Sequence, residues 1–289
     1  MEAFRFVVIL LFFACYVVTV VLNALASTGK LFENTPSKVS SKYSTYLTPV
    51  GWTFSIWIVI YVWLGLILVY VLSLIWRKSA GERLFETSPI ADPLPLLFLC
   101  LNLILNFTWL FLWSQEWLVA SAIVLFLITA SGWIALVIFY VRVHEVARDL
   151  LEEGKWNMAF IRYIVFNGLE TYNAWTSIAF LVNLSVVLAH VSGKSLESSA
   201  NIPLSLLVGV LALWVPFEAT AFDKYGRYGF MHYFVLTFAM SGIYSNEEPR
   251  SRGVNTYIVV LMALFAFLIL CRSAFIAHRN SHRPQYIPL

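Results

Sequence analysis

Aromatic and amide side chains recur at helical spacing in three apolar segments of the chain. Residues three or four positions apart lie on one face of a helix, so each set forms a stripe. The stripes consist of Trp57, Tyr61 and Gly65, of Asn102, Asn106, Trp109 and Trp113, and of Tyr172, Trp175, Ala179 and Asn183. Each stripe combines aromatic rings with a small residue or an amide, a mixture that can either join helices or hold a ligand.

Two interpretations of these stripes remain open. In the first they join helices: asparagine amides bridge neighbours, small residues allow close approach, and Trp and Tyr mark the membrane interface. In the second they converge on a cavity with aromatic walls, which suits a planar, mainly apolar ligand. The ligand-binding residues would then be Trp57, Tyr61, Asn106, Trp109, Tyr172, Trp175 and Asn183.

Two acidic residues, Glu170 and Glu218, fall inside apolar runs. A carboxylate in such a place pairs with a cation, lies at the interface, or belongs to an ion or proton relay. Arg162, two helical turns before Glu170, is the expected partner. The relay interpretation predicts a secondary transporter that uses Glu170 and Glu218, although the chain shows no evident inverted repeat. His232 is expected to be a structural hydrogen-bonding residue.

Other chemistry has little support in the sequence. Cys15, Cys100 and Cys271 lie in apolar runs without metal-ligand spacing, and no metal cluster, nucleophile elbow or phosphate-binding glycine loop occurs. A receptor would fit seven spans, but the last span has no lysine to hold retinal. We expect no catalytic residues and no metal, and a binding protein is favoured over an enzyme.

The composition places these stripes in a membrane. Of the 289 residues, 60% are apolar, 17% are aromatic and 12% are charged, about half the charged share of a soluble domain. The net charge of +3 includes no basic run, so a nucleic-acid partner is not expected. Lipid is the expected surrounding, and a homodimer is a candidate assembly.

The hydropathy pattern predicts an all-α, polytopic membrane bundle, because only closed hydrogen-bonding structures are stable in lipid. About eight transmembrane helices are expected, over 6–26, 51–76, 94–113, 118–141, 164–191, 204–222, 229–244 and 256–277. The segment 229–244 is the weakest, since it is short and contains His232.

The distribution of basic residues predicts the orientation. With eight spans, thirteen Lys and Arg fall on one side and six on the other, which places both termini in the cytoplasm. The organelle is not indicated. Ala24-Leu25-Ala26 resembles a signal-peptide cleavage site, but the apolar run before it is longer than a usual signal core, so a retained first helix is favoured.

The stripes also carry a resemblance to a known family. Tyr172-x-x-Trp175-x-x-x-Ala179-x-x-x-Asn183, with Thr171 in place of a proline, resembles the fifth helix of the TspO/MBR family of tryptophan-rich sensory proteins. The pair Asn106 and Trp109 is similar to that family's third helix. Trp57, Tyr61 and Gly65 after Pro49 are similar to its second helix.

This resemblance covers roughly 6–191, and the longer branch of the family is the better match. It implies a TspO-like five-helix bundle over 1–191, with 192–289 forming an appended three-helix membrane unit and a short cytoplasmic tail. It also implies an internal pocket for a tetrapyrrole or sterol, with the loop 27–50 as a lid and a sensor or translocator role.

Two finer expectations depend on the same resemblance. The cholesterol motif of the family is missing after Val182, and only Leu136, Tyr140 and Arg142 match it loosely. Porphyrin degradation, linked to tryptophans in part of the family, would use Trp57 and Trp175. No cofactor is certain, and a tetrapyrrole is the candidate ligand.

Overall fold

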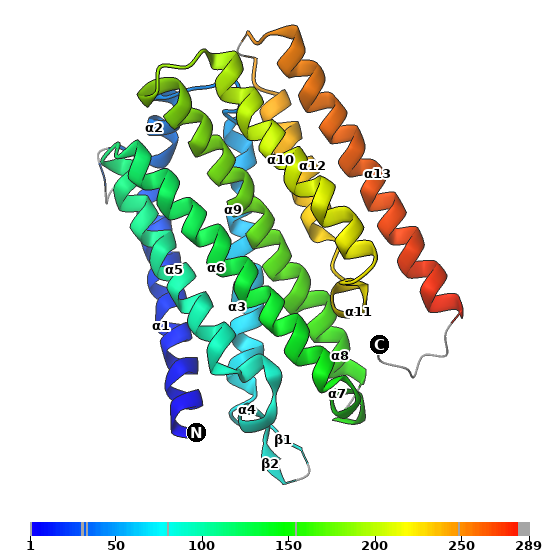
Figure 1. Ribbon diagram of the computed structural model, residues 1–289. Helices are drawn as coiled ribbons and strands as arrows, with labels where there is room; N and C mark the ends of the chain where they lie inside the picture. Colours follow the sequence, from blue (N-terminus) through cyan, green and yellow to red (C-terminus); the bar gives the residue numbers. More distant parts are fainter. Residues whose placement is uncertain are drawn as a thin grey trace.

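The computed structural model describes residues 2–282 except 30, 31, 33, 80, 154 and 248. It is a polytopic membrane bundle made almost wholly of helices, as the hydropathy pattern predicts (Figure 1). Seven described helical segments are long and apolar enough to cross a bilayer. They cover Glu2–Ser27, Gly51–Ser73, Pro93–Ser114, Leu118–Glu145, Trp156–Val191, Leu196–Ala219 and Arg252–Arg279.

The helices follow one another with short connections. Their bounds in the first half are α1 Glu2–Ser27, α2 Pro36–Lys42, the 3-10 turn η1 Gly51–Ser55, α3 Ile56–Ser73, α4 Leu84–Thr87, the 3-10 turn η2 Pro89–Ala91, α5 Pro93–Ser114 and α6 Leu118–Glu145. In the second half they are α7 Ala147–Glu153, α8 Lys155–Phe160, η3 Ile161–Phe166, α9 Asn167–Val186, η4 Val187–Val191, α10 Leu196–Ala219, α11 Asp223–Gly226, α12 Met231–Tyr244 and α13 Arg252–His282. Two short strands, β1 Lys78–Ser79 and β2 Glu82–Arg83, pair antiparallel beyond the end of α3.

The predicted span 229–244 is the point at which the structure differs from the expected eight. The helix there, α12, has 14 residues and is about 21 Å long, less than the roughly 30 Å of a hydrocarbon core. It still runs antiparallel to α10 and α13, so α1 begins and α13 ends at the same end of the bundle (Figure 1).

Helix α9 lies at the centre of the bundle. It packs against α3, α6, α10 and α12, and every residue from Asn167 to Thr176 is buried. Because protein rather than lipid surrounds it, α9 can carry polar side chains all around its circumference. Its ends are π-helical turns, η3 and η4, in which the hydrogen bonds skip one residue more than in an α-helix.

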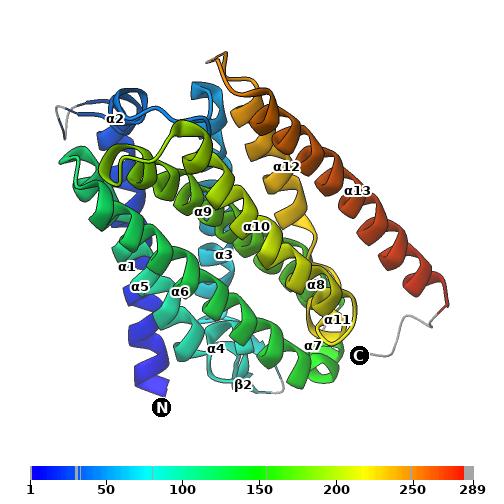
Figure 2. The same cartoon turned by 45° about the horizontal axis from the view of Figure 1, so that its top comes forward.

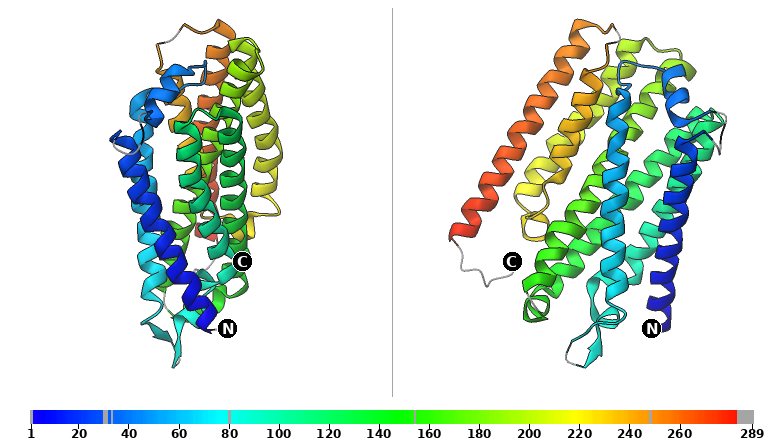
Figure 3. Two further views of the ribbon diagram at one scale, coloured as in Figure 1. Left: turned by 90° about the vertical axis from the view of Figure 1, so that its left-hand side faces the viewer. Right: turned by 180° about the vertical axis from the view of Figure 1, so that it is seen from behind.

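The remaining helices surround α9 in an order that differs from the order of the chain. Helix α5 packs between α1 and α6, while α12 packs between α9 and α13. Seen from behind, α3 lies between α1 and α12 (Figure 3). Helices of the predicted appended unit therefore pack directly on the TspO-like part of the chain.

Candidate functional site

A pocket lies near the end of the bundle opposite the start of α1, beneath α2. The space inside it that a water-sized sphere can occupy is about 50 Å³, so the walls lie close together and would have to move apart to admit a large ligand. The described residues that line it are Pro36, Ser40, Thr48, Pro49, Phe54, Trp57, Trp109, Trp113, Trp175, Ile178, Ala179, Val182, Asn183, Val186, Ala239 and Ile243. None of these carries a charge, so the pocket suits an apolar ligand.

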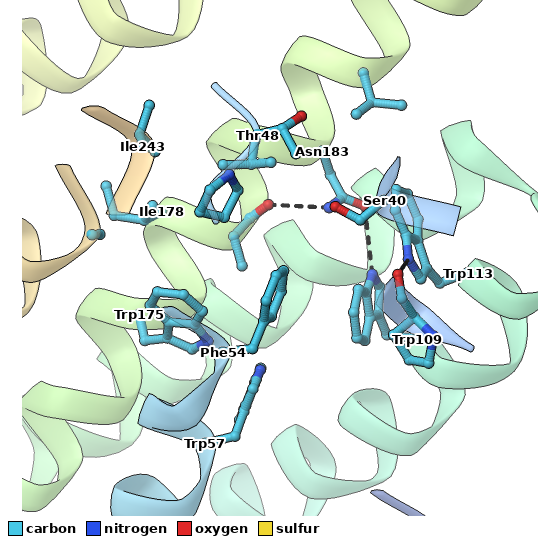
Figure 4. A pocket seen from close by; sticks show the side chains of 16 residues that line it. Ser40, Thr48, Phe54, Trp57, Trp109, Trp113, Trp175, Ile178, Asn183 and Ile243 are labelled. Atoms are coloured by element: carbon cyan, nitrogen blue, oxygen red, sulfur yellow. Dashed lines mark hydrogen bonds between the residues drawn. The ribbon is translucent and has the colours of Figure 1, made fainter. Parts of the chain in front are cut away.

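Aromatic rings from three helices form its walls (Figure 4). The Trp57 ring meets the Trp175 ring edge-on with centroids 6.2 Å apart, and Phe54 meets Trp175 in the same way at 6.4 Å. On the opposite side Trp109 and Trp113 stack at 5.9 Å. Flat surfaces on two sides of a pocket can sandwich a planar ring system.

The indole N–H groups of two lining tryptophans, Trp109 and Trp175, differ in whether they have a hydrogen-bond acceptor. The Trp109 indole N–H donates to Asn183 Oδ1 at 3.5 Å. The Trp175 indole N–H is buried and has no hydrogen-bond partner among the described residues. A buried donor without an acceptor costs free energy, so this position would gain from a ligand that accepts a hydrogen bond.

The other three predicted ligand-binding residues, Tyr61, Asn106 and Tyr172, do not line the pocket. They form a hydrogen-bonded layer next to it: Tyr61 Oη donates to Asn106 Oδ1 at 3.3 Å, and Asn106 Nδ2 donates to Tyr172 Oη at 3.2 Å. Asn23 of α1 also donates to Asn106 Oδ1 at 3.1 Å. The Trp57 ring stacks on Tyr61 with centroids 5.5 Å apart, so this layer supports the pocket wall.

The helix-joining interpretation describes the rest of the stripes. Asn102 Nδ2 donates to the Ile128 carbonyl at 2.6 Å and so joins α5 to α6. Gly65 faces α1, where a side-chain carbon would lie 2.6 Å from Tyr16 Oη. The helix-joining interpretation thus applies to Asn102 and Gly65, while the ligand-binding interpretation stays a prediction for the residues that line the pocket.

Several lining residues were not among the predicted ones. Phe54 precedes Trp57 by three positions, and Trp113 already belonged to the stripe with Trp109 although it was left out of the ligand-binding set, so helical spacing contained the signal for both. Ala239 and Ile243 come from α12, and nothing in their own sequence marks them. The appended helices therefore contribute to the pocket wall.

Helix α2 lies across one end of the bundle (Figure 2), where it and the loop after it contribute Pro36, Ser40, Thr48 and Pro49 to the pocket wall. The Trp113 indole N–H donates to the Pro36 carbonyl at 3.1 Å, which ties the start of α2 to α5. At the other end, Lys42 Nζ lies 2.5 Å from Glu116 Oε2, to which Tyr43 Oη also donates at 2.7 Å. The long loop predicted as a lid thus has a fastened helix at its centre.

This fastening is expected to depend on pH. The hydrogen bond from Lys42 lowers the pKa of Glu116 below 4.5, while the same contact raises the pKa of Lys42. A lowered carboxyl pKa stabilises the folded contact above the unfolded pKa, and that stabilisation is lost as pH falls through the folded value. We expect Glu116→Gln to increase hydrogen–deuterium exchange of the α2 amides severalfold at pH 7 and to abolish its acid dependence.

The matched control is Glu82→Gln in β2, which removes a carboxylate at the other end of the bundle and should leave exchange in α2 unchanged. Equal protection of α2 in the Glu116→Gln protein and in wild type would contradict the role of Glu116 as a fastening.

A second polar site lies toward the other end of α9. Glu170 is 3% exposed, and its Oε1 accepts a hydrogen bond from Tyr140 Oη at 2.7 Å. Its Oε2 accepts from the backbone N–H of Met231 and faces His232 Nδ1, each at 3.1 Å. The predicted partner Arg162 is not its partner: that guanidinium stacks on Tyr228 at 4.4 Å. The expectation failed because α12 brings its own N–H and imidazole to Glu170.

Glu218 lies on the other side of the same imidazole. His232 Nε2 is 3.5 Å from Glu218 Oε1, and Tyr233 Oη donates to Glu218 Oε2 at 2.6 Å. Arg272 of α13 lies 3.6 Å from Glu218 Oε1. The structure therefore brings the two predicted relay carboxylates together around His232.

Arg272 extends this group to α11. Its guanidinium is 3.7 Å from Asp223 Oδ1 and donates to the Gly226 carbonyl at 2.8 Å, and Arg227 donates to Asp223 Oδ2 at 2.6 Å. Arg272 is 6% exposed. Arg272 is one of the thirteen Lys and Arg residues counted on the cytoplasmic side, but the structure buries it between helices.

The loose cholesterol motif does not form a lipid-facing site. Leu136 and Tyr140 are buried, and Arg142 lies 3.4 Å from Asp92 Oδ2. Among the described residues no group of three His, Cys, Asp or Glu side chains is arranged to hold a metal.

Comparison with known proteins identifies the family. No curated protein and no solved structure matches the chain. The sequence model of the TSPO-like protein family matches residues 8–274, and so extends past Val191, where the recognised motifs stop, into α13. Because this match covers nearly the whole chain, the protein belongs to the TSPO-like protein family.

Proposed function

We propose that the chain binds a planar, mainly apolar ligand, of tetrapyrrole or sterol type, in the aromatic pocket, and serves as a sensor or translocator for it. Membership of a TSPO-like family supports a membrane protein of this kind. The observation that carries the proposal is the buried Trp175 N–H, which lacks an acceptor in a wall built of aromatic rings.

The lining restricts how such a ligand binds. An uncharged wall disfavours a buried carboxylate, because moving a charge out of water is costly. Two basic residues, Lys38 and Lys42, lie on α2, the helix that contributes Pro36 and Ser40 to the pocket wall. A tetrapyrrole would therefore place its ring system between the tryptophans and its carboxylates toward α2, whereas a sterol would need only the hydroxyl to face polar groups.

Removing one tryptophan wall tests the proposal. We expect Trp175→Ala and Trp57→Ala each to weaken protoporphyrin or cholesterol binding by about tenfold, equal to about 1.4 kcal/mol, because each deletes a ring that contacts the ligand. Binding is measured by tryptophan quenching and by mass spectrometry of protein in nanodiscs. The fluorescence readout is corrected for the deleted indole.

The control is Trp76→Ala, because Trp76 is 75% exposed and lies outside the pocket. Binding that is saturable in wild type but unchanged by both pocket variants would remove the ligand from this pocket. A preference for one of the two ligands would decide between tetrapyrrole and sterol.

The alternative function, a secondary transporter using Glu170 and Glu218, is supported by a different observation. Both carboxylates approach His232 within 3.5 Å in the interior of the bundle. A buried carboxylate–imidazole–carboxylate group is a common arrangement in proton relays. Uptake driven by a pH gradient into proteoliposomes, abolished by Glu170→Gln, would favour this function.

A further inference from the structure

The buried polar site around His232 has an imbalance of charge. We use the name buried charge cluster for Glu170, Glu218, Asp223, Arg227, His232 and Arg272. Three of these side chains are carboxylates and two are guanidiniums, so the cluster carries one net negative charge when the imidazole is neutral. An uncompensated charge is expensive inside a membrane protein, and one added proton neutralises it.

His232 is the group best placed to hold that proton. Nδ1 is 3.1 Å from Glu170 Oε2 and Nε2 is 3.5 Å from Glu218 Oε1, so an imidazolium would donate toward a carboxylate on each side. Nε2 is buried and has no hydrogen-bond partner among the described residues. The side chain is 3% exposed, so solvent does not satisfy it.

Both carboxylates also accept hydrogen bonds from α12. The first amides of α12 point at Glu170 and Asn167: Met231 N–H donates to Glu170 Oε2 at 3.1 Å, and Phe230 N–H donates to Asn167 Oδ1 at 3.2 Å. The N-terminus of a helix stabilises an anion. Tyr233 Oη donates to Glu218 Oε2 at 2.6 Å, so α12 contacts both glutamates.

The neighbouring charged groups do not replace the proton. A cleft lies beside the cluster, and its lining includes Tyr140, Arg162 and Lys224. The Arg162 guanidinium lies over the Tyr228 ring at 4.4 Å, and the Lys224 ammonium lies over the Tyr225 ring at 4.6 Å. No ion pair joins either of them to a cluster member in the described part of the chain. Tyr140 of α6 and Tyr233 of α12 face the carboxylates as neutral donors.

We propose that the buried charge cluster is a proton-binding site, in which His232 holds one exchangeable proton between Glu170 and Glu218. The site lies where α9 packs against α10 and α12, with α13 packed on the far side of α12. The sequence predicted a relay at the two glutamates. The structure adds Asp223 of α11, His232 of α12 and Arg272 of α13 to them.

The cleft gives the proton a route from solvent. It holds about 510 Å³ counting its open mouth, and Tyr140 lines it while bonding to Glu170. The Tyr140 hydroxyl passes its proton to Glu170 Oε1 and takes one from a hydronium ion in the cleft, which becomes water. The neutral ring in this step carries its proton on Nε2. Glu170 turns its carboxyl group so that the protonated oxygen faces His232, and gives that proton to the lone pair of Nδ1. The imidazole becomes an imidazolium, and the net charge of the cluster rises from −1 to 0.

Helices α9 and α12, which hold Glu170 and His232, also contribute to the aromatic pocket. Glu170 and Trp175 both lie on α9, and His232 and Ala239 both lie on α12. A protonated His232 attracts Glu170 and draws α12 against α9, and a tighter seam brings the pocket walls together. Ligand affinity is therefore expected to fall when the proton is lost; this step rests on the proposed function.

The experiment is solid-state NMR of ¹⁵N-histidine protein in lipid bilayers at pH 7, with the His232 signals assigned by their loss in His232→Gln. Wild type is expected to show both ring nitrogens protonated. Glu170→Gln and Glu218→Gln each remove the excess negative charge and should leave a neutral ring. Tyr233→Phe removes a hydrogen bond without changing the charge and should keep the imidazolium.

A double variant with an unchanged net charge tests whether the loss of the imidazolium is due to the change in charge or to damage to the fold. Glu218→Gln with Arg272→Gln restores the net charge of −1 and should restore the imidazolium that Glu218→Gln alone loses. A neutral His232 in wild type, or an imidazolium that persists in both single glutamine variants, would overturn the proton site.

Two further measurements test the route and the coupling. Tyr140→Phe should slow exchange of the His232 N–H protons severalfold without changing the protonation state, and unchanged exchange would overturn the route. Protoporphyrin affinity should weaken between pH 6 and pH 9 in wild type but stay constant in His232→Gln. A dependence on pH that is equal in both would overturn the coupling, whereas absence of all binding would instead refute the pocket.

Discussion

Replacing Arg272 by methionine is expected to lower the free energy of unfolding by about 3–5 kcal/mol, the cost of leaving a buried charge without its partner. The guanidinium lies 3.6 Å from Glu218 and 3.7 Å from Asp223, and it donates to two backbone carbonyls of the loop around α11. Its loss leaves two carboxylates facing each other across an apolar side chain.

Stability is measured by unfolding in mixed micelles with increasing SDS. Arg252→Met is the matched control, because Arg252 lies at the exposed start of the same helix and should change stability little. The double variant Arg272→Met with Glu218→Gln should recover part of the loss. Equal stability of Arg272→Met and Arg252→Met would show that the buried ion pairs contribute nothing to the packing of α13.

Replacing Asn106 by leucine is expected to be the second most damaging change, at about 2–4 kcal/mol. The Tyr61 and Tyr172 hydroxyls would each lose the amide that they contact, and a buried polar group left unpaired costs about 1–3 kcal/mol. The layer that supports Trp57 would also loosen, so ligand binding should weaken along with stability.

Thr108→Val provides the control on the same helix. Among the described residues, the Thr108 hydroxyl bonds to the Ile104 carbonyl of its own helix, at 2.8 Å, and its replacement should change stability by a few tenths of a kcal/mol at most. Thermal unfolding of the two variants in one detergent gives the comparison. An Asn106→Leu protein as stable as Thr108→Val would exclude a structural role for the amide layer.

Helical spacing within a segment predicted much of the pocket. Trp57, Trp109, Trp175 and Asn183 line it because residues on one face of a helix stay together whatever the partner helices are. The same spacing could not tell how far the pocket reaches along each stripe, since that depends on how the helices cross. Asn106 therefore lies in the layer beside the pocket and not on its wall.

Spacing along the sequence could not predict the buried charge cluster. Glu170, Glu218 and His232 were visible as polar residues in apolar surroundings, but their partners are set by tertiary contacts between α9, α10 and α12. Arg272 falls within the predicted span 256–277, but its position in the sequence does not show whether it faces lipid, solvent or protein. Only the packing of α13 on α12 shows that it faces inward.

The π-helical turns at both ends of α9 bear on how the chain tolerates changes in length. Each turn contains one residue more than an α-helix needs for the same rotation, so deleting one residue there would convert it to ordinary helix while the segments on either side keep nearly the same orientation. A deletion within the α-helical stretch between them would instead rotate everything beyond it by about 100° and divide the face that runs from Tyr172 to Asn183. Loss of a residue is therefore expected to be tolerated at the two ends of α9, within 161–166 and 187–191, and not along the pocket face between them.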